Sequence, residues 1–515
     1  MLRGEKAFPR RRNQRGSSRL PHAVGSGDGD ASSSQNSPGS LVSTTETVKT
    51  RGSDQIAQPT STKAQSPLQR LLPQSIPYSP YLPLEDTVIP LFINSFLYVP
   101  KDPQTTNGFM DLLPQSYSNT KFGSHLHLAT LAVSFFSVAA WTGQRSLLRS
   151  SELFFLKALP KTREALQYGI RDNLEEILMT VLLLSTYEEF YAMKDSNRPA
   201  RTHLRGAVAL VNSRRPEQSN SPSSEILTRA VQIQIIRHST GLSYPSIPTP
   251  NLWPIFAPMA PNAPSQLAVA ASQLVNLRLE WEGLTSDNAQ PPSQSSISDI
   301  LSKANSFDAN LSTWAGNAPA HWAPIPASSI PESVRTACAG LYQNRCDCYP
   351  DLWVASVWNL YRDTRIAALN IILTCLRLLS TQNSTNPNFI ANDNDNAIQS
   401  TLTTIHSLAT DICGTVPFFI GSQTSPVLFN TNIVQYPEAE GRTVTSAHKQ
   451  TAPLLGGWYV ITYLAHISVP GLGLDEEMLR WIRGQMGRVL RIYGFGAQQG
   501  RDISGSSMGN SVKVG

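Results

Sequence analysis

Apolar residues recur at helical spacing between residues 174 and 211. Leu174, Ile177, Leu178, Val181 and Leu182 lie at i, i+3, i+4, i+7 and i+8, the spacing of one face of an α-helix. The polar run at 195–199 interrupts this pattern, and a second stripe restarts at Leu204 with the same periodicity. The pattern predicts two amphipathic helices joined by a polar turn.

The rest of the chain repeats this organisation. Further helices are predicted at 88–96, 122–141, 150–159, 225–238, 265–281, 298–314, 351–380, 397–413, 453–467 and 475–493. In the last of these, Arg480, Arg483, Arg488 and Arg491 lie opposite the apolar arc, and we expect them to face solvent. The predicted fold class is all-α, with one large multi-helix regulatory domain.

Composition changes sharply at the start of the chain. Residues 1–75 contain stretches such as GSGDGDASSSQNSPGS, which bury too little apolar surface to offset the entropy of ordering. Of the 515 residues, 40% are hydrophobic, which is enough for a substantial core. We therefore expect a disordered tail at 1–75, a helical domain at 76–498 and a disordered C-terminal tail at 499–515.

Positive charge is concentrated in the first twenty residues. They hold seven basic residues and one acid, a balance of +6, whereas the whole chain carries +5. The basic character therefore belongs to the tail, and the remaining residues sum to −1. The cluster Arg10, Arg11, Arg12 and Arg15 is predicted to act in nuclear import. A phosphate-contacting arm and a merely solvated basic segment are the alternatives.

Two features bear on the compartment. The basic start is not followed by an apolar segment, so no secretory signal is predicted, and five scattered cysteines indicate reduced thiols in an intracellular protein. Residues 122–144 lack charged side chains but include His125 and His127, which are unfavourable in lipid. We interpret this stretch as a buried helix and expect no membrane partner.

Motifs for catalysis or metal binding are not recognised. Cys338, Cys346 and Cys348 form C-x7-C-x-C, which is not the spacing of a zinc knuckle. G-x-S-x-G, P-loop and H-E-x-x-H patterns are absent from the sequence. We therefore predict no catalytic, cofactor-binding or metal-binding residues and a protein that is not an enzyme.

Several motifs resemble those of a known family. Tyr187-Glu188, followed by His203-Leu204-Arg205-Gly206-Ala207, is similar to the regulatory region of fungal binuclear zinc-cluster transcription factors. Val416-Pro417 matches a turn of the same family, and the resemblance extends over residues 84–498. It implies that Tyr187, Glu188, His203, Gly206 and Pro417 are structural residues of the family motif.

The resemblance also implies a function. It points to a nuclear transcriptional regulator of a fungal metabolic or secondary-metabolite pathway, with a homodimer contact, a small-metabolite effector and the transcription machinery as partners. The first cysteine is Cys338, so zinc and DNA binding are expected only through a missing N-terminal six-cysteine cluster, or DNA binding through a partner factor. The alternative is a helical co-regulator or interaction protein without DNA binding. A third reading is a helical enzyme without recognisable motifs.

Overall fold

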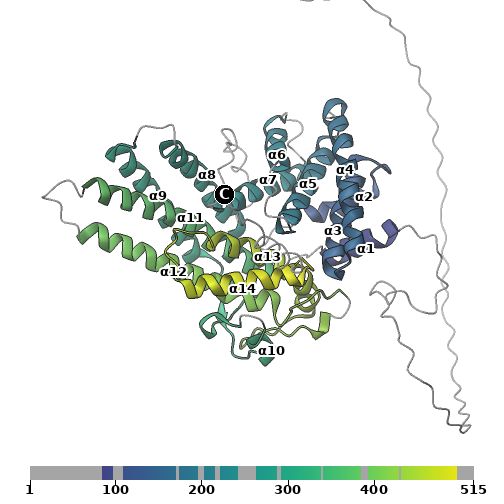
Figure 1. Ribbon diagram of the computed structural model, residues 1–515. Coiled ribbons are helices and arrows are strands. Elements are labelled where there is room, and N and C mark those ends of the chain that lie inside the picture. The colour runs from purple at the N-terminus through teal and green to yellow at the C-terminus, as the bar shows by residue number, and fades with distance from the viewer. Residues whose placement is uncertain are drawn as a thin grey trace, which may run out of the picture. The chain divides into compact units, whose positions relative to one another are not determined.

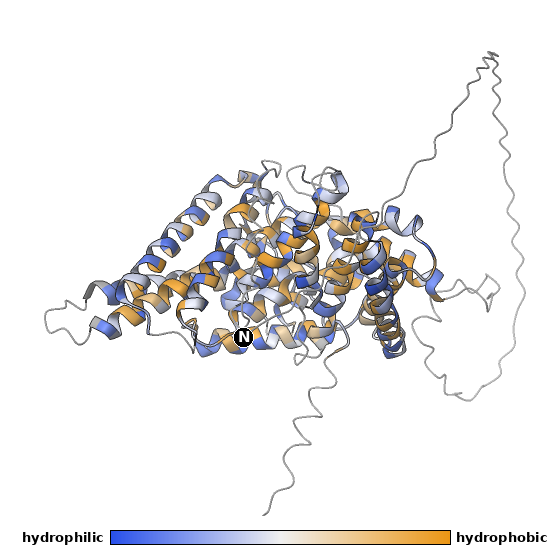
Figure 2. Cartoon of the chain, turned by 90° about the horizontal axis from the view of Figure 1, so that it is seen from above, coloured by the Kyte–Doolittle hydropathy of each residue, from blue (hydrophilic) through white to orange (hydrophobic). Residues whose placement is uncertain are grey.

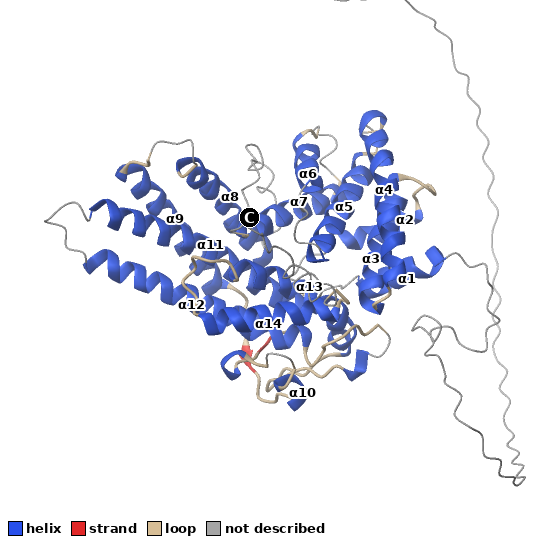
Figure 3. Cartoon of the chain, in the orientation of Figure 1, coloured by secondary structure: helices blue, strands red, loops and turns tan. Residues whose placement is uncertain are grey.

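The computed structural model describes residues 84–96, 102, 108–169, 173–194, 202–214, 221–241, 262–286, 291–337, 340–383, 392–428 and 431–495. These residues form fourteen α-helices, short 3-10 turns and one pair of two-residue strands (Figures 1 and 3). The predicted all-α fold class is confirmed. The predicted tails and the arginine cluster at 10–15 lie outside the described residues.

The elements follow one another along the chain with short connections. The α-helices are α1 (Leu84–Phe96), α2 (Leu113–Ser118), α3 (His125–Thr142), α4 (Arg145–Tyr168), α5 (Leu174–Lys194), α6 (Thr202–Asn212), α7 (Pro222–Thr240), α8 (Ala263–Leu284), α9 (Gln294–Asn317), α10 (Glu332–Arg335), α11 (Leu352–Asn383), α12 (Asn392–Ile420), α13 (Ser446–Ile467) and α14 (Glu476–Ile492). The 3-10 turns are η2 (Phe109–Leu112), η5 (Ala320–Trp322), η6 (Tyr342–Asn344) and η7 (Thr431–Ile433). Strands β1 (Ile325–Pro326) and β2 (Asp347–Cys348) pair antiparallel.

Helix α3 is the centre of the N-terminal helices. It packs on α1, α4 and α5 and is buried on nearly every side. Ser124 caps its first turn by accepting a hydrogen bond from the His127 amide, and Gly143 ends it in the left-handed conformation. The prediction of a buried helix at this position is confirmed.

Two helices of the described part are long and apolar enough to cross a membrane, at His125–Thr142 and Leu352–Gln382. In the first, 89% of the apolar window is buried inside the protein, and in the second 61%. Figure 2 shows apolar residues concentrated where the helices face one another. Both helices therefore supply core surface to their neighbours.

Helix α11 organises the C-terminal helices. It packs on α8, α9, α12 and α13, and Arg365 joins it to α9 through a bidentate contact with Asp308 at 2.6 and 3.0 Å. Helix α13 approaches α12 closely at Gly456, where an added Cβ would lie 1.8 Å from the Phe419 carbonyl oxygen. Only glycine fits at this helix crossing.

Two helices continue further than the periodicity predicted. Helix α4 runs through Pro160, which lies on the exposed side, so water can hydrogen-bond the carbonyl that proline leaves without a donor. Helix α12 begins at Asn392 and runs through Pro417 to Ile420, rather than spanning 397–413. Pro417 stands in its last turn, where a lost hydrogen bond costs little compared with the packing of the surrounding buried residues.

One prediction about α14 was wrong. Arg488 does not face solvent with the other arginines but is only 2% exposed. Its guanidinium donates to the carbonyls of Gln423, at 2.8 Å, and Gly421. The turn after α12 presents these carbonyls to α14, and a buried arginine satisfies both.

Candidate functional site

The junction of α5 and α6 joins Glu188 to His203. The His203 Nδ1 atom lies 2.8 Å from Oε1 of Glu188, an ionic contact that is not aligned as a hydrogen bond. The backbone amide of His203 donates to Oε2 of the same carboxylate at 3.3 Å. His203 lies in the first turn of α6, where amides lack helical acceptors. Glu188 therefore caps α6 from the neighbouring helix, at its positive end.

Aromatic packing surrounds this contact. Tyr187 stacks on Phe155 of α4, with ring centroids 4.3 Å apart, and meets Phe136 of α3 edge-on. Phe155 in turn meets the His203 ring edge-on at 5.8 Å. At Gly206, an added Cβ would find only the Val181 side chain, at an ordinary contact distance of 3.9 Å. The structure thus brings Tyr187, Glu188, His203 and Gly206 together where α4, α5 and α6 meet.

Pro417 lies apart from this group, in the last turn of α12. It is buried, and Gly421 follows with a φ of 48°. A Cβ at Gly421 would lie 2.3 Å from the Gln435 carbonyl oxygen, so glycine is required at this turn. Pro417 therefore belongs to the end of α12, which the turn and Arg488 hold in place.

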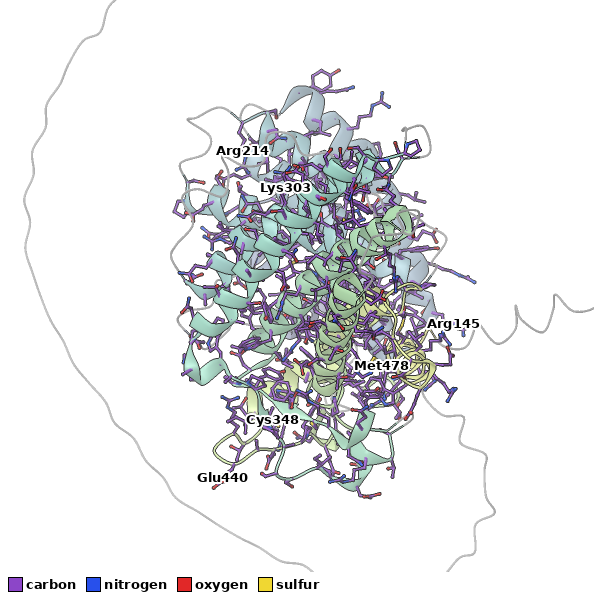
Figure 4. All side chains as sticks on the ribbon, turned by 90° about the vertical axis from the view of Figure 1, so that its left-hand side faces the viewer. Arg145, Arg214, Lys303, Cys348, Glu440 and Met478 are labelled. Atoms are coloured by element: carbon purple, nitrogen blue, oxygen red, sulfur yellow. The ribbon has the colours of Figure 1, made fainter. Side chains whose placement is uncertain are left out.

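The cysteines are dispersed and inaccessible. Cys346, Cys348, Cys375 and Cys413 are buried and unbridged, whereas Cys338 lies outside the described residues. Figure 4 shows Cys348 near the edge of the helical body, in the same part of the view as Glu440. Its Sγ lies 3.7 Å from the Pro437 carbonyl oxygen. Within the described ranges, no group of three or more His, Cys, Asp or Glu side chains could hold a metal ion.

A cavity of about 180 Å³ lies between α5, α7 and α13, beside η2. Helix α7 contributes one continuous face to it, and α5 and α13 contribute residues at helical spacing. The lining residues of α7 are Ile226, Arg229, Ala230, Ile233, Gln234 and Arg237; those of α5 are Thr186 and Glu189, and those of α13 are Leu455, Trp458 and Tyr459. Phe96, Phe109, Met110 and Trp353 complete the apolar wall.

Two opposite charges stand in this cavity without forming an ion pair. Glu189 and Arg237 both line it, and both retain some accessible surface although they lie deep among the helices. Burial raises the pKa of Glu189, while Arg237 works in the opposite direction. Burial also opposes the charge of Arg237, but Tyr463 and Glu189 outweigh it and its pKa is raised.

Several polar atoms around the cavity have no partner. Among the described residues, buried atoms of cavity-lining side chains without a hydrogen bond are Asp111 Oδ2, Arg229 Nε, Gln234 Oε1, Arg237 Nε and Trp353 Nε1. Such atoms are costly to bury, and native proteins usually satisfy them with protein, water or ligand. Donors and acceptors are both represented, so the cavity can hydrogen-bond a molecule that carries both kinds of group.

The sequence contained a weak signal for this cavity. Arg229, Ile233 and Arg237 recur every four residues, which places two basic side chains on an otherwise apolar face of α7. Glu189 follows directly after the family motif, and one helical step turns it from α6 toward α7. Neither feature predicts that the three helices leave a space between them.

Comparisons with known proteins identify the family. Residues 85–415 match the profile of the fungal specific transcription factor domain. The chain is also 21% identical over 318 residues to the transcription factor dbaG of Emericella nidulans, covering 58% of this chain and 68% of that protein. No solved structure matches the chain. The match spans more than half of the sequence and describes transcription factor domains, not an enzyme family, and the chain therefore belongs to the fungal specific transcription factor domain family.

Proposed function

We propose that the protein is a nuclear transcriptional regulator of a fungal metabolic or secondary-metabolite pathway, and that its helical domain responds to a small-molecule effector. The observation that carries the proposal is the family match over residues 85–415. The resemblance of the Tyr187–His203 region to zinc-cluster regulators supports a regulatory role for these helices. The partly polar cavity between α5, α7 and α13 supports an effector.

The remaining parts of this proposal concern the rest of the chain. Arg10, Arg11, Arg12 and Arg15 provide the nuclear-import signal, and the helical domain extends over 76–498, flanked by tails at 1–75 and 499–515. DNA contact occurs through an N-terminal zinc cluster or a partner factor, and a homodimer contact and the transcription machinery complete the assembly. Tyr187, Glu188, His203, Gly206 and Pro417 hold the domain together.

Transcript profiling in the native fungus tests the function. Deletion and overexpression of the full chain should shift the transcripts of one set of pathway genes in opposite directions. A fluorescent fusion should accumulate in the nucleus and lose that enrichment when the four arginines are changed to alanine. The control changes Arg145 and Arg149, which lie on α4, to alanine. Unchanged transcripts in both strains would contradict the proposal.

A further inference from the structure

The size of the cavity between α5, α7 and α13 limits what it holds. Its volume is about 180 Å³, slightly more than the cavity of roughly 150 Å³ that binds a benzene molecule in an engineered protein. A single six-membered ring with a few substituents therefore fits, whereas a fused polycyclic molecule does not. An adjoining apolar space of about 20 Å³ shares Phe96, Leu455 and Trp458 with it.

The walls favour a flat ring. Phe96 and Phe109 line the cavity from the N-terminal side, and Trp458 and Tyr459 line it from α13. Trp458 also packs edge-on against Phe190 at 4.0 Å, which fixes its indole. Aromatic walls stack on or meet the edge of a planar ligand, with a gain beyond simple burial.

The balance of charge favours a neutral molecule. Asp111 and Glu189 oppose Arg229 and Arg237 in the lining, and Arg229 is already held by Glu225 at 2.7 Å. Neither sign of charge is in excess inside the cavity, apart from the carboxylates whose charge burial disfavours. An ionic ligand would add a charge without a free counter-charge, which is costly away from water.

The unpaired polar atoms call for hydroxyl groups. Nε of Arg237 and Nε1 of Trp353 are donors without acceptors, and Oε1 of Gln234 is an acceptor without a donor. The Glu189 carboxylate has no hydrogen bond or ion pair among the described residues. A hydroxyl both donates and accepts, so two hydroxyls on one ring satisfy groups of both kinds without adding charge.

We propose that this cavity binds an uncharged, single-ring aromatic molecule carrying hydroxyl groups, and that the bound molecule ties α5 and α7 to α13. This inference deepens the proposed function, since the molecule would be the effector. Binding satisfies the orphan donors and acceptors and fills the space, so it stabilises the arrangement of the three helices. A regulatory domain that changes stability with occupancy couples effector concentration to its output.

The test titrates the purified full chain with four single-ring probes and follows binding by ligand-observed NMR. Resorcinol is neutral with two hydroxyls, toluene has no polar group, benzoate is an anion and benzylamine a cation. Resorcinol should bind to one saturable site, and the other three about tenfold or more weaker, since each leaves polar groups unmatched or buries a charge.

Two variants locate the site. Ala230→Leu fills the cavity from α7 and should abolish resorcinol binding, whereas Ala309→Leu, at an exposed position of α9, should leave it unchanged. Gln234→Leu removes an orphan acceptor while keeping the volume similar, so it should weaken resorcinol and narrow its advantage over toluene. Circular dichroism melts establish that each variant is folded.

The proposal is overturned if toluene binds as tightly as resorcinol, if either charged probe binds more tightly, or if no probe binds. Resorcinol binding that survives in folded Ala230→Leu also overturns it, because the site would lie elsewhere. Transcript profiling is independent of these titrations. A regulator that shifts its target transcripts but binds none of the probes would refute this inference and leave the proposed function standing.

Discussion

Two regions of the protein bury arginine side chains, and they treat the guanidinium differently. At the contact of α12 and α14, Arg488 donates from Nε to Gln423, from Nη2 to Gly421 and from Nη1 to Gln485. In the cavity beside α7, Arg237 has no partner for Nε, and its Nη2 reaches only Thr462, at 3.5 Å. The first guanidinium is satisfied by the fold, and the second is not.

The difference separates structural from binding groups. A buried charge that is fully hydrogen-bonded holds particular backbone atoms in place, and removing it leaves those atoms unsatisfied. A buried charge without partners costs stability, and such a cost is typical of sites that bind something. We therefore expect variants at Arg488 to affect folding and variants at the cavity to affect binding.

The largest expected effect is that of Arg488→Ala. It removes the donors of two buried carbonyl groups and should lower the free energy of unfolding by about 3 kcal/mol or more. Thermal melting followed by circular dichroism measures the loss. Arg480→Ala, at an exposed position on the same helix, should change little.

Arg488→Lys sharpens this prediction. A lysine keeps the charge but cannot reproduce the planar fork of donors. It should therefore recover only part of the lost stability. If Arg488→Ala melts like the unchanged protein, the distinction between the two regions is wrong.

A smaller effect is expected where Glu188 meets His203. Glu188→Ala and His203→Ala should each destabilise the protein by about 1 kcal/mol, because each removes a partly buried contact. The two losses should not add in the double variant, since both remove the same interaction. Strictly additive losses in urea denaturation would show that the contact contributes nothing.

The smallest effect is expected for Glu189→Gln, and its sign is opposite. Because the pKa of Glu189 is raised in the folded protein, its carboxyl contributes stability at low pH that is lost as pH rises through that pKa. Glutamine cannot ionise, so the variant should be equal to or more stable than the unchanged protein at about pH 7.5, by up to about 1 kcal/mol.

This advantage should disappear near pH 4.5, the ordinary pKa of a glutamate side chain. Melting temperatures at both pH values measure the difference. A destabilised Glu189→Gln at neutral pH would indicate that Glu189 is paired in solution, and the cavity would then resemble the Arg488 region.

The sequence by itself determined the helices and the family. Apolar residues at helical spacing predicted α5, α7, α11 and α14 because one face of each helix must be buried, and that requirement is written locally. The Tyr187-Glu188 and His203–Ala207 motifs pointed to the family for the same reason, since they are short and contiguous.

Helix ends at prolines were less predictable. Whether Pro160 and Pro417 stop a helix depends on what surrounds the carbonyl that loses its donor, and the periodicity of the chain carries no such information.

Only the tertiary structure decided which charges are satisfied. Arg488 and Arg491 are alike in sequence context, yet one meets the carbonyls of a turn about 65 residues away and the other faces solvent. Likewise, Glu189 and Arg237 come from separate helices, and their cavity exists because three helices fail to close completely against one another. Hydrogen-bond partners and empty space arise from the packing of distant segments, so a local pattern of residues cannot specify them.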